Sequence, residues 1–205
     1  MMLIIGACSY MPVDVAVLIG AVGDQADNSN IHVQMSFLEL MISNFKISKS
    51  GIHFGVYTYG INDQGDQNKQ VIDFSATTTD AMVSEVKKIP HNMFKVHGKA
   101  TISKGIEKVK LDFLLGKTGR QSQKVVIILA GEPDSDGLEK LKDATKYFKE
   151  TGTKVIAVNT NAPGFPDLQE VASDGGYLNN YLFKDTTGTV KAVSQKLCKS
   201  IGKYL

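Results

Sequence analysis

The sequence predicts an α/β protein with a doubly wound, mostly parallel six-stranded sheet, one antiparallel edge strand and helices on both faces. Two observations carry this prediction. Short apolar segments alternate along the whole chain with segments whose apolar residues recur every three or four positions. Three of the short segments are apolar on both sides, which is typical of strands buried in the middle of a parallel sheet.

The fully apolar segments are expected to form the centre of the sheet. The first begins after Pro12 and is interrupted only by Asp14. The alternating segment "IHFGVYTY" at residues 52–59 is expected to pair with residues 71–74 as a hairpin across a polar loop, which gives the antiparallel edge. The six expected strands are residues 13–19, 52–59, 71–74, 125–130, 155–158 and 181–183.

Helices are expected wherever apolar residues recur at helical spacing. Pro90 and Gly152 mark the ends of two of them. Ser135 or Asp136 is expected to cap the helix that follows the strand at residues 125–130. The expected helices lie near residues 31–45, 82–89, 102–113, 138–148, 167–173 and 190–201.

The composition sets limits on the function. A chain of 205 residues with 42% hydrophobic residues suits one substantial domain, expected to span residues 1–205 with its core at about 12–204. Lys and Arg number 23 against 21 Asp and Glu, so the net charge of +2 gives no reason to expect nucleic acid as a partner. No apolar run reaches the roughly 18 residues of a membrane helix, so we expect no membrane insertion by this domain.

The two cysteines lie close to the two ends of the chain. Cys8 precedes the first strand and Cys198 lies in the last helix, and neither belongs to a CxxC or a Cys/His cluster. If the ends lie side by side, a Cys8–Cys198 disulfide is expected, which would imply an oxidising compartment. The alternative is two unrelated free thiols.

Motifs for cofactors and catalysis are missing. After the first strand, a dinucleotide-binding G-x-G-x-x-G would need glycines where Val22 and Gln25 stand, and no Walker loop occurs. The four histidines are scattered, and no G-x-S-x-G supplies a nucleophile. The segment "EPDSDGLEKLKD" has calcium-loop spacing, but a strand precedes it instead of a helix. We therefore expect no enzyme and no cofactor.

The layout of the whole chain resembles the von Willebrand factor A (VWA) domain, an α/β fold of Rossmann-like architecture. The similar segments are "DVAVLIGAVGD" at residues 14–24, "FGVYTYG" at 54–60, "GKATISKGIEKV" at 98–109, "KVVIILAGEPDSDG" at 124–137 and "GTKVIAVNT" at 152–160. Flanking cysteines that join the two ends are also a feature of several members of that family.

The resemblance implies a metal-ion-dependent adhesion site, in which two aspartates, two serines and a threonine surround a magnesium-like ion. This chain departs from that pattern, because only one of the five matching positions keeps a side-chain oxygen. The matching positions are Gly20, Val22, Asp24, Ala100 and Gly131. A slip of one residue would bring in Thr101 and Glu132, and Asp27 or Asp134 could reach inward, but the leading aspartate would still be missing. We expect no bound metal.

The resemblance therefore predicts an extracellular protein-binding module, secreted or part of a surface protein, that works without a metal. Its expected partners are matrix or adhesive proteins such as collagen. A structural or self-associating unit of a larger matrix protein is the alternative, and an intracellular scaffold of the same fold is a third. The candidate contact residues lie in loops at the carboxyl ends of the strands. They are Asp24, Gln25, Asp27, His97, Lys99, Glu132, Asp134 and Asp136.

Overall fold

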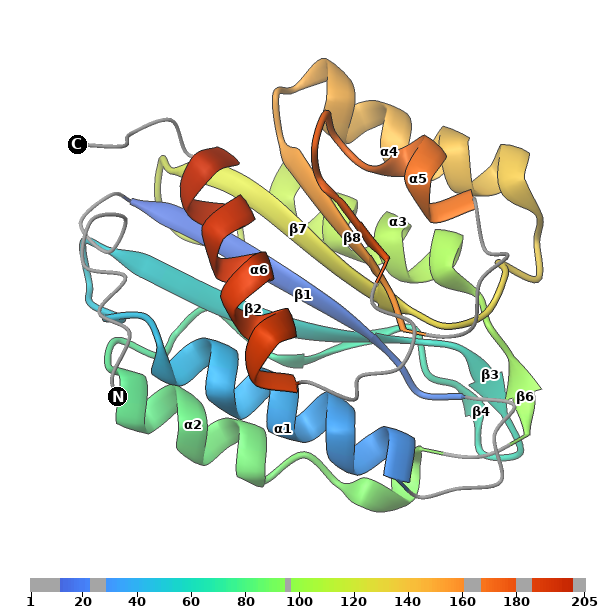
Figure 1. The fold of residues 1–205 in the computed structure, drawn as a ribbon, viewed down its shortest axis with the longest axis horizontal. Helices are drawn as coiled ribbons and strands as arrows, with labels where there is room; N and C mark the ends of the chain where they lie inside the picture. The colour runs from blue at the N-terminus through green and yellow to red at the C-terminus, as the bar shows by residue number, and fades with distance from the viewer. Residues whose placement is uncertain (1–11, 23–28, 95–96, 161–166, 180–185, 201–205) are drawn as a thin grey trace.

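A computed structural model describes residues 12–22, 29–94, 97–160, 167–179 and 186–200. Its main sheet has six strands in the order β5-β2-β1-β7-β8-β9 (Figure 1). All neighbours in this sheet are parallel except β5, which runs antiparallel to β2 at one edge. The strands are β1 (Val13–Gly20), β2 (Ile52–Tyr59), β5 (Lys69–Ile72), β7 (Gln123–Ala130), β8 (Lys154–Asn159) and β9 (Tyr177–Asn179). The predicted fold class is confirmed.

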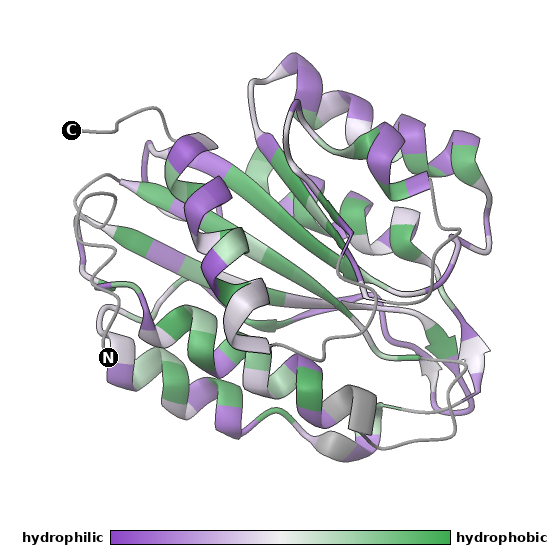
Figure 2. Cartoon of the chain, in the orientation of Figure 1, coloured by the Kyte–Doolittle hydropathy of each residue, from purple (hydrophilic) through white to green (hydrophobic). Residues whose placement is uncertain are grey.

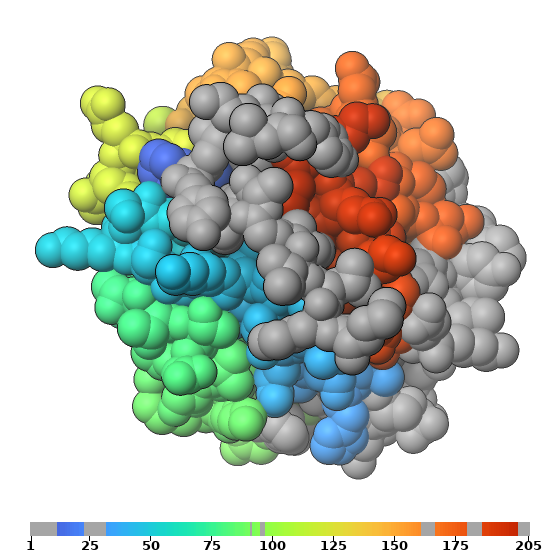
Figure 3. Space-filling model, turned by 60° about the vertical axis from the view of Figure 1, so that its left-hand side comes forward, coloured from blue at the N-terminus to red at the C-terminus, as the bar shows by residue number. Residues whose placement is uncertain are grey.

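Helices cover both faces of the sheet (Figure 1). On one face, α1 (Ser29–Ser43) lies between α2 (Thr79–Lys87) and α6 (Thr186–Ser200) and contacts both, as Figure 3 also shows. The other face carries α3 (Ile102–Leu114), α4 (Leu138–Glu150) and α5 (Asp167–Val171). A short 3₁₀ helix, η1 (His91–Met93), follows α2.

The core consists of two apolar layers, one on each side of the sheet. All eight residues of β1 and all eight of β2 are buried, because these strands have neighbours on both edges and helices on both faces. Hydrophobic residues accordingly run along the central strands in Figure 2, while hydrophobic and hydrophilic residues alternate along the helices. No helix in the described part of the chain combines the length and hydropathy that a membrane crossing requires.

A second, smaller sheet was not predicted. The polar loop expected between β2 and β5 contains β3 (Ile61–Asn62) and β4 (Gly65–Asp66), and β3 also pairs with β6 (Gly98–Lys99). The order is β4-β3-β6. Each strand has only two residues, which is too short for a periodic pattern, so no local signal indicates pairing between segments more than 30 residues apart.

Two local predictions need correction. The sixth strand is β9 at Tyr177–Asn179, whereas residues 181–183, where it was expected, lie outside the described residues. Neither Ser135 nor Asp136 caps α4. Its N-cap is Gly137, with φ of 89° and no side-chain cap hydrogen bond. Glycine adopts this left-handed conformation without the penalty that a Cβ would bring.

A network of charged groups closes the amino-terminal end of the sheet. The Asp14 carboxylate in β1 is fully buried and accepts hydrogen bonds from Arg120, Ser122 and Lys124. The Arg120 guanidinium also donates to the carbonyl oxygens of Val13 and Gly51, at 2.9 and 2.6 Å. Burial alone would raise the pKa of Asp14, but the hydrogen bonds from Lys124, Ser122 and Arg120 outweigh it and hold the pKa below its ordinary value.

Candidate functional site

The candidate site lies at the carboxyl ends of the parallel strands. The register of the sheet places Gly20 of β1 beside Tyr59 of β2, and Ala130 of β7 beside Asn159 of β8. Loops from different parts of the chain therefore meet at this edge, where open α/β sheets bind their ligands. We call this edge, with residues 20–22, 59–68, 97–103 and 130–137, the top face.

Tyr59 fills the space at the centre of the top face. Its side chain is 3% exposed, and its hydroxyl donates a hydrogen bond of 3.0 Å to the Leu129 carbonyl oxygen. A Cβ added to Gly20 would lie 3.0 Å from this hydroxyl, and one added to Gly105 of α3 would lie 2.8 Å from the Tyr59 Cβ. The tyrosine thus occupies the room that a side chain at Gly20 would need.

The electrostatic surroundings keep the Tyr59 phenol protonated. Burial raises its pKa far above the ordinary value, and the nearby carboxylates of Glu132 and Asp134 raise it further. Tyr59 is therefore a neutral hydrogen-bond donor here. A phenolate, which could coordinate a metal ion, is disfavoured.

Val22 fills a second part of the top face, beneath the small sheet. It is half-buried and packs against the apolar layer formed by α3 and α4. A Cβ on Gly60 would lie 2.9 Å from the Val22 Cγ2 atom, and one on Gly98 would lie 2.5 Å from its Cγ1 atom. The two glycines therefore allow β3 and β6 to close over an apolar side chain.

The loop before α3 uses its polar groups internally. Ala100, at the position of the expected threonine, is 5% exposed. Its neighbour Thr101 is 1% exposed and donates a hydrogen bond of 2.9 Å from Oγ1 to Asn68 Oδ1. The amide group of Asn68 donates in turn to Asp66 Oδ1 at 2.6 Å. Thr101 thus holds the loop before β5 in place, and its oxygen is not directed at an open ion site.

Asp134 is the most unusual carboxylate of the top face. It is 4% exposed, and its Oδ1 atom accepts a hydrogen bond of 3.4 Å from the backbone N–H of Ser103, in the first turn of α3. Its Oδ2 atom is buried without a hydrogen-bond partner. Burial raises the pKa of Asp134, and the hydrogen bonds from Ser103 only partly oppose this. The carboxylate thus meets the positive end of a helix other than the one that follows it.

The other candidate residues are more accessible. His97, Lys99 and Asp136 are exposed, and Glu132 is half-buried. The Lys104 ammonium lies 4.0 Å from Asp136 Oδ2, which is a loose surface ion pair. Lys99 is part of β6. Asp24, Gln25 and Asp27 lie outside the described residues.

The metal-ligand positions implied by the family resemblance do not fit an ion where the structure describes them. Gly20 and Ala100 have no side-chain oxygen, and Gly131 is half-buried and has none either. Tyr59 and Val22 occupy the adjoining space. No group of three or more His, Cys, Asp and Glu side chains among the described residues is arranged to hold a metal. Asp24 lies outside these residues.

Sequence reasoning missed Tyr59 and Asn68 as organising residues of this face, and it considered Thr101 only as a possible metal ligand. A weak signal was present, because glycines at 60 and 98 flank two-residue strands and an Asn/Asp/Gly-rich segment follows the first of them. The contacts themselves join residues that are far apart in sequence, such as Tyr59 and Leu129. Pattern alone could not pair them.

Solved structures with the same fold include proteins with matrix or adhesive names. Proximal thread matrix protein 1 from the mussel byssus, with a zinc-occupied metal-ion-dependent adhesion site, matches with a TM-score of 0.76 and 18% identity over 93% of this chain and 46% of that one. The manganese-loaded TRAP protein of Plasmodium vivax matches with a TM-score of 0.70 and 10% identity, over 91% of this chain and 74% of the TRAP chain. The pilus adhesin SpaC of Lactobacillus rhamnosus GG matches with a TM-score of 0.65 and 10% identity, over 93% of this chain and 30% of the adhesin.

The chain spans about half of the byssus protein and less than a third of the pilus adhesin. A comparison with curated protein sequences gave no match. The sequence model of the von Willebrand factor type A domain, however, matches residues 17–196. This range includes every described helix and strand except the beginning of β1 and the end of α6. This chain belongs to the von Willebrand factor type A domain family.

Proposed function

We propose that this chain is an extracellular binding module that holds a matrix or adhesive protein, such as collagen, at its top face without a metal ion. The observation that carries the proposal is the packing of Tyr59 against Gly20, the position of a missing metal ligand. Where the family resemblance calls for an aspartate, Gly20 stands against the Tyr59 hydroxyl, with 3.0 Å between that oxygen and an added Cβ. A metal-bridged contact with a partner's carboxylate would need both groups to move.

The top face still offers a surface suited to a protein partner. Exposed Lys99 and Asp136 place charges of both signs at this edge, and exposed His97 adds a polar ring. Polar and charged groups of this kind form the rim of non-obligate interfaces. Buried Asp134 would act by positioning the start of α3, through Ser103, and not by direct contact. Asp24, Gln25, Glu132 and Asp27 complete the proposed contact set.

The test is a binding screen of immobilised matrix proteins, with fibrillar collagen as the first probe, run with magnesium and with EDTA. We expect equal binding in both buffers and equal melting temperatures. The double variant Lys99→Gln/Asp136→Asn should weaken binding. The matched control is Lys146→Gln/Glu150→Gln, which removes an exposed ion pair of α4, 3.9 Å between Nζ and Oε1, outside the top face.

A melting temperature that rises by several degrees with magnesium, or binding that disappears in EDTA, would overturn the metal-free mechanism. Equal loss of binding in the test and control variants would instead overturn the top face as the contact surface. A metal-independent complex that depends on Lys99 and Asp136 would support both parts of the proposal.

A structural role in a larger assembly is the second candidate. It is favoured by the likeness to a protein named as a thread matrix protein, although that likeness carries the fold alone. Size-exclusion chromatography with light scattering distinguishes the two roles. A dimer that forms with increasing concentration supports assembly, whereas a monomer that captures collagen supports adhesion.

The proposed location outside the cell depends on a Cys8–Cys198 disulfide. Cys8 lies outside the described residues, while Cys198 is 8% exposed in α6. Gln123 supports the pairing because its N–H donates to the Pro12 carbonyl oxygen and its Nε2 to that of Ser200, both at 3.1 Å. Pro12 and Ser200 are thus both hydrogen-bonded to Gln123. Alkylation without reductant should leave the mass unchanged, and two alkylated thiols would contradict the disulfide.

A further inference from the structure

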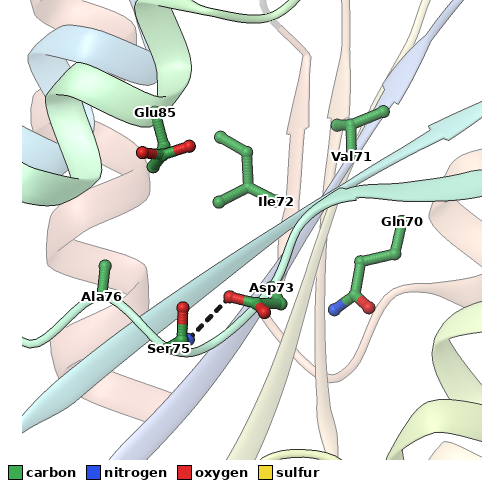
Figure 4. Close-up of a pocket in the computed structure, with 7 residues that line it drawn as sticks. All are labelled: Gln70, Val71, Ile72, Asp73, Ser75, Ala76 and Glu85. Atoms are coloured by element: carbon green, nitrogen blue, oxygen red, sulfur yellow. Dashed lines mark hydrogen bonds between the residues drawn. The ribbon is translucent and has the colours of Figure 1, made fainter.

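A groove of about 460 Å³ lies at the β5 edge of the main sheet. Its lining consists of residues 70–73, Ser75, Ala76 and Glu85, which come from β5, the segment after it and α2 (Figure 4). None of these residues belongs to the top face. The groove is therefore a second surface, and a role for it is independent of the function proposed for the first.

Strand β5 is an edge strand beside this groove, and its register against β2 shifts at Val71. It is the end member of the six-stranded sheet, and among the described residues it pairs with β2 only. The outer row of N–H and C=O groups of an edge strand is a template for one more strand. Proteins that bind extended peptides use such edges, with backbone hydrogen bonds for affinity and side-chain pockets for specificity.

The groove presents more polar than apolar surface, and its charged lining is entirely acidic. Val71 is half-buried and supplies apolar surface to the groove, whereas Ile72 is 6% exposed and belongs to the core. Asp73 and Glu85 are the charged residues of the lining, and no Lys, Arg or His is among them. An added strand with an acidic side chain would be repelled here, whereas one with a basic side chain would be attracted.

Both carboxylates can still accept a hydrogen bond from a partner's side chain. Asp73 Oδ1 accepts a hydrogen bond of 2.9 Å from the Ser75 N–H, which holds the carboxylate beside the strand end, as Figure 4 shows. Glu85 pairs with Lys88 at 2.6 Å, but both side chains are exposed, at 47% and 66%. An exposed ion pair of this kind contributes little to stability, so a partner's cation can replace or share it.

We propose that the β5 edge binds an extended segment of a partner protein that carries a lysine or arginine, which contacts Asp73 and Glu85 while the segment's backbone pairs with β5. The short length of β5, four residues, fits a segment of similar length. An apolar side chain next to the basic residue would rest on Val71.

The test uses an eight-residue peptide of alternating valine and threonine with two central lysines, together with a version in which glutamates replace the lysines. We expect the lysine peptide to bind and to slow amide hydrogen exchange at residues 70–73, and the glutamate peptide to do neither. The double variant Asp73→Asn/Glu85→Gln should weaken binding roughly three- to tenfold, since it removes two partly exposed charge contacts.

The matched control variant is Asp143→Asn/Glu150→Gln, which removes two exposed charges from α4 and should leave peptide binding unchanged. A lysine peptide with alternate backbone nitrogens methylated, tested in both registers, should fail in one register and bind in the other. Equal binding by both methylated peptides would overturn strand pairing. Equal affinity for the Asp73→Asn/Glu85→Gln variant and the unmodified protein would overturn the charge contact.

Discussion

A buried aspartate lies at each end of the sheet, and the two carboxylates have opposite pKa shifts. At the amino-terminal end, both oxygens of Asp14 accept hydrogen bonds from cationic or hydroxyl groups, and its pKa is lowered. At the top face, Asp134 has one partner for Oδ1 and none for Oδ2, and its pKa is raised. The two carboxylates are similarly buried, at 0% and 4% exposure, so burial does not explain the difference.

The difference lies in the neighbouring charges. Arg120 and Lys124 compensate Asp14, whereas Asp136 and the start of α3 surround Asp134. A buried carboxylate whose pKa is lowered contributes stability at neutral pH. A partly compensated one costs stability, and such groups concentrate where proteins carry out functions. This contrast supports the proposal that the binding surface lies at the top face.

The largest expected effect is that of Asp14→Asn, which leaves Arg120 and Lys124 without their counterion. Since these two side chains are 16% and 19% exposed, we expect a loss of about 3 kcal/mol in the free energy of unfolding at pH 7, at the lower end of the range for a broken buried pair. Because the folded pKa is lowered, this stabilisation is present above the unfolded pKa and disappears as the pH falls through the folded value.

Urea unfolding of both proteins at neutral and acidic pH measures this effect. The difference in the free energy of unfolding between the unmodified protein and the Asp14→Asn variant should narrow as the pH falls. Asp143→Asn, an exposed substitution on α4, serves as the control and should change the stability by less than about 0.5 kcal/mol. A gap that stays constant with pH would show that the loss comes from packing and not from the charge.

An intermediate effect is expected for Gly20→Ala, which forces a Cβ to within 3.0 Å of the Tyr59 hydroxyl. Overpacking of this kind costs about 1–3 kcal/mol. Tyr59→Phe alone should cost about 1 kcal/mol through the lost hydrogen bond to Leu129. The double variant should be more stable than the sum predicts, by more than about 0.5 kcal/mol, because the phenylalanine lacks the crowded oxygen. Strict additivity in thermal or urea unfolding would mean that the Tyr59 hydroxyl is not the atom that crowds this space.

The smallest effect is expected for Asp134→Asn, within about 1 kcal/mol and in the stabilising direction at pH 7. The amide oxygen can still accept the Ser103 N–H, and the charge is gone. Because the folded pKa of Asp134 is raised, the wild-type group stabilises below the unfolded pKa, and this contribution is lost as the pH rises through the folded value. The advantage of the variant should therefore shrink in acid.

The two aspartate variants, measured side by side, show whether the two ends of the sheet differ. Asp14→Asn should be harmful and Asp134→Asn mildly beneficial at neutral pH, and the differences should both narrow as the pH falls. Asp136→Asn, at an exposed neighbour of Asp134, should show little change at any pH. A loss of stability in Asp134→Asn that matches that of Asp14→Asn would mean that the top-face carboxylate is as well compensated as the structural one.

The order and type of the main elements could be predicted from residue patterns alone. Strands β1, β7 and β8 are continuous apolar runs because both of their faces are covered, and the helices keep one apolar stripe facing the sheet. These patterns are local, so they can be recognised without knowing the fold. The loss of metal-ligand oxygens at Gly20, Val22 and Ala100 was also visible in the sequence.

What replaced those oxygens depends on the three-dimensional arrangement. Tyr59 reaches Leu129 across 70 positions, Val22 lies under Gly60 and Gly98, and Asp134 meets α3 instead of capping α4. Each contact joins segments that become neighbours only when parallel strands align their carboxyl ends. Steric fit and the balance of burial against nearby charge act through space, and residue spacing along the chain does not record them.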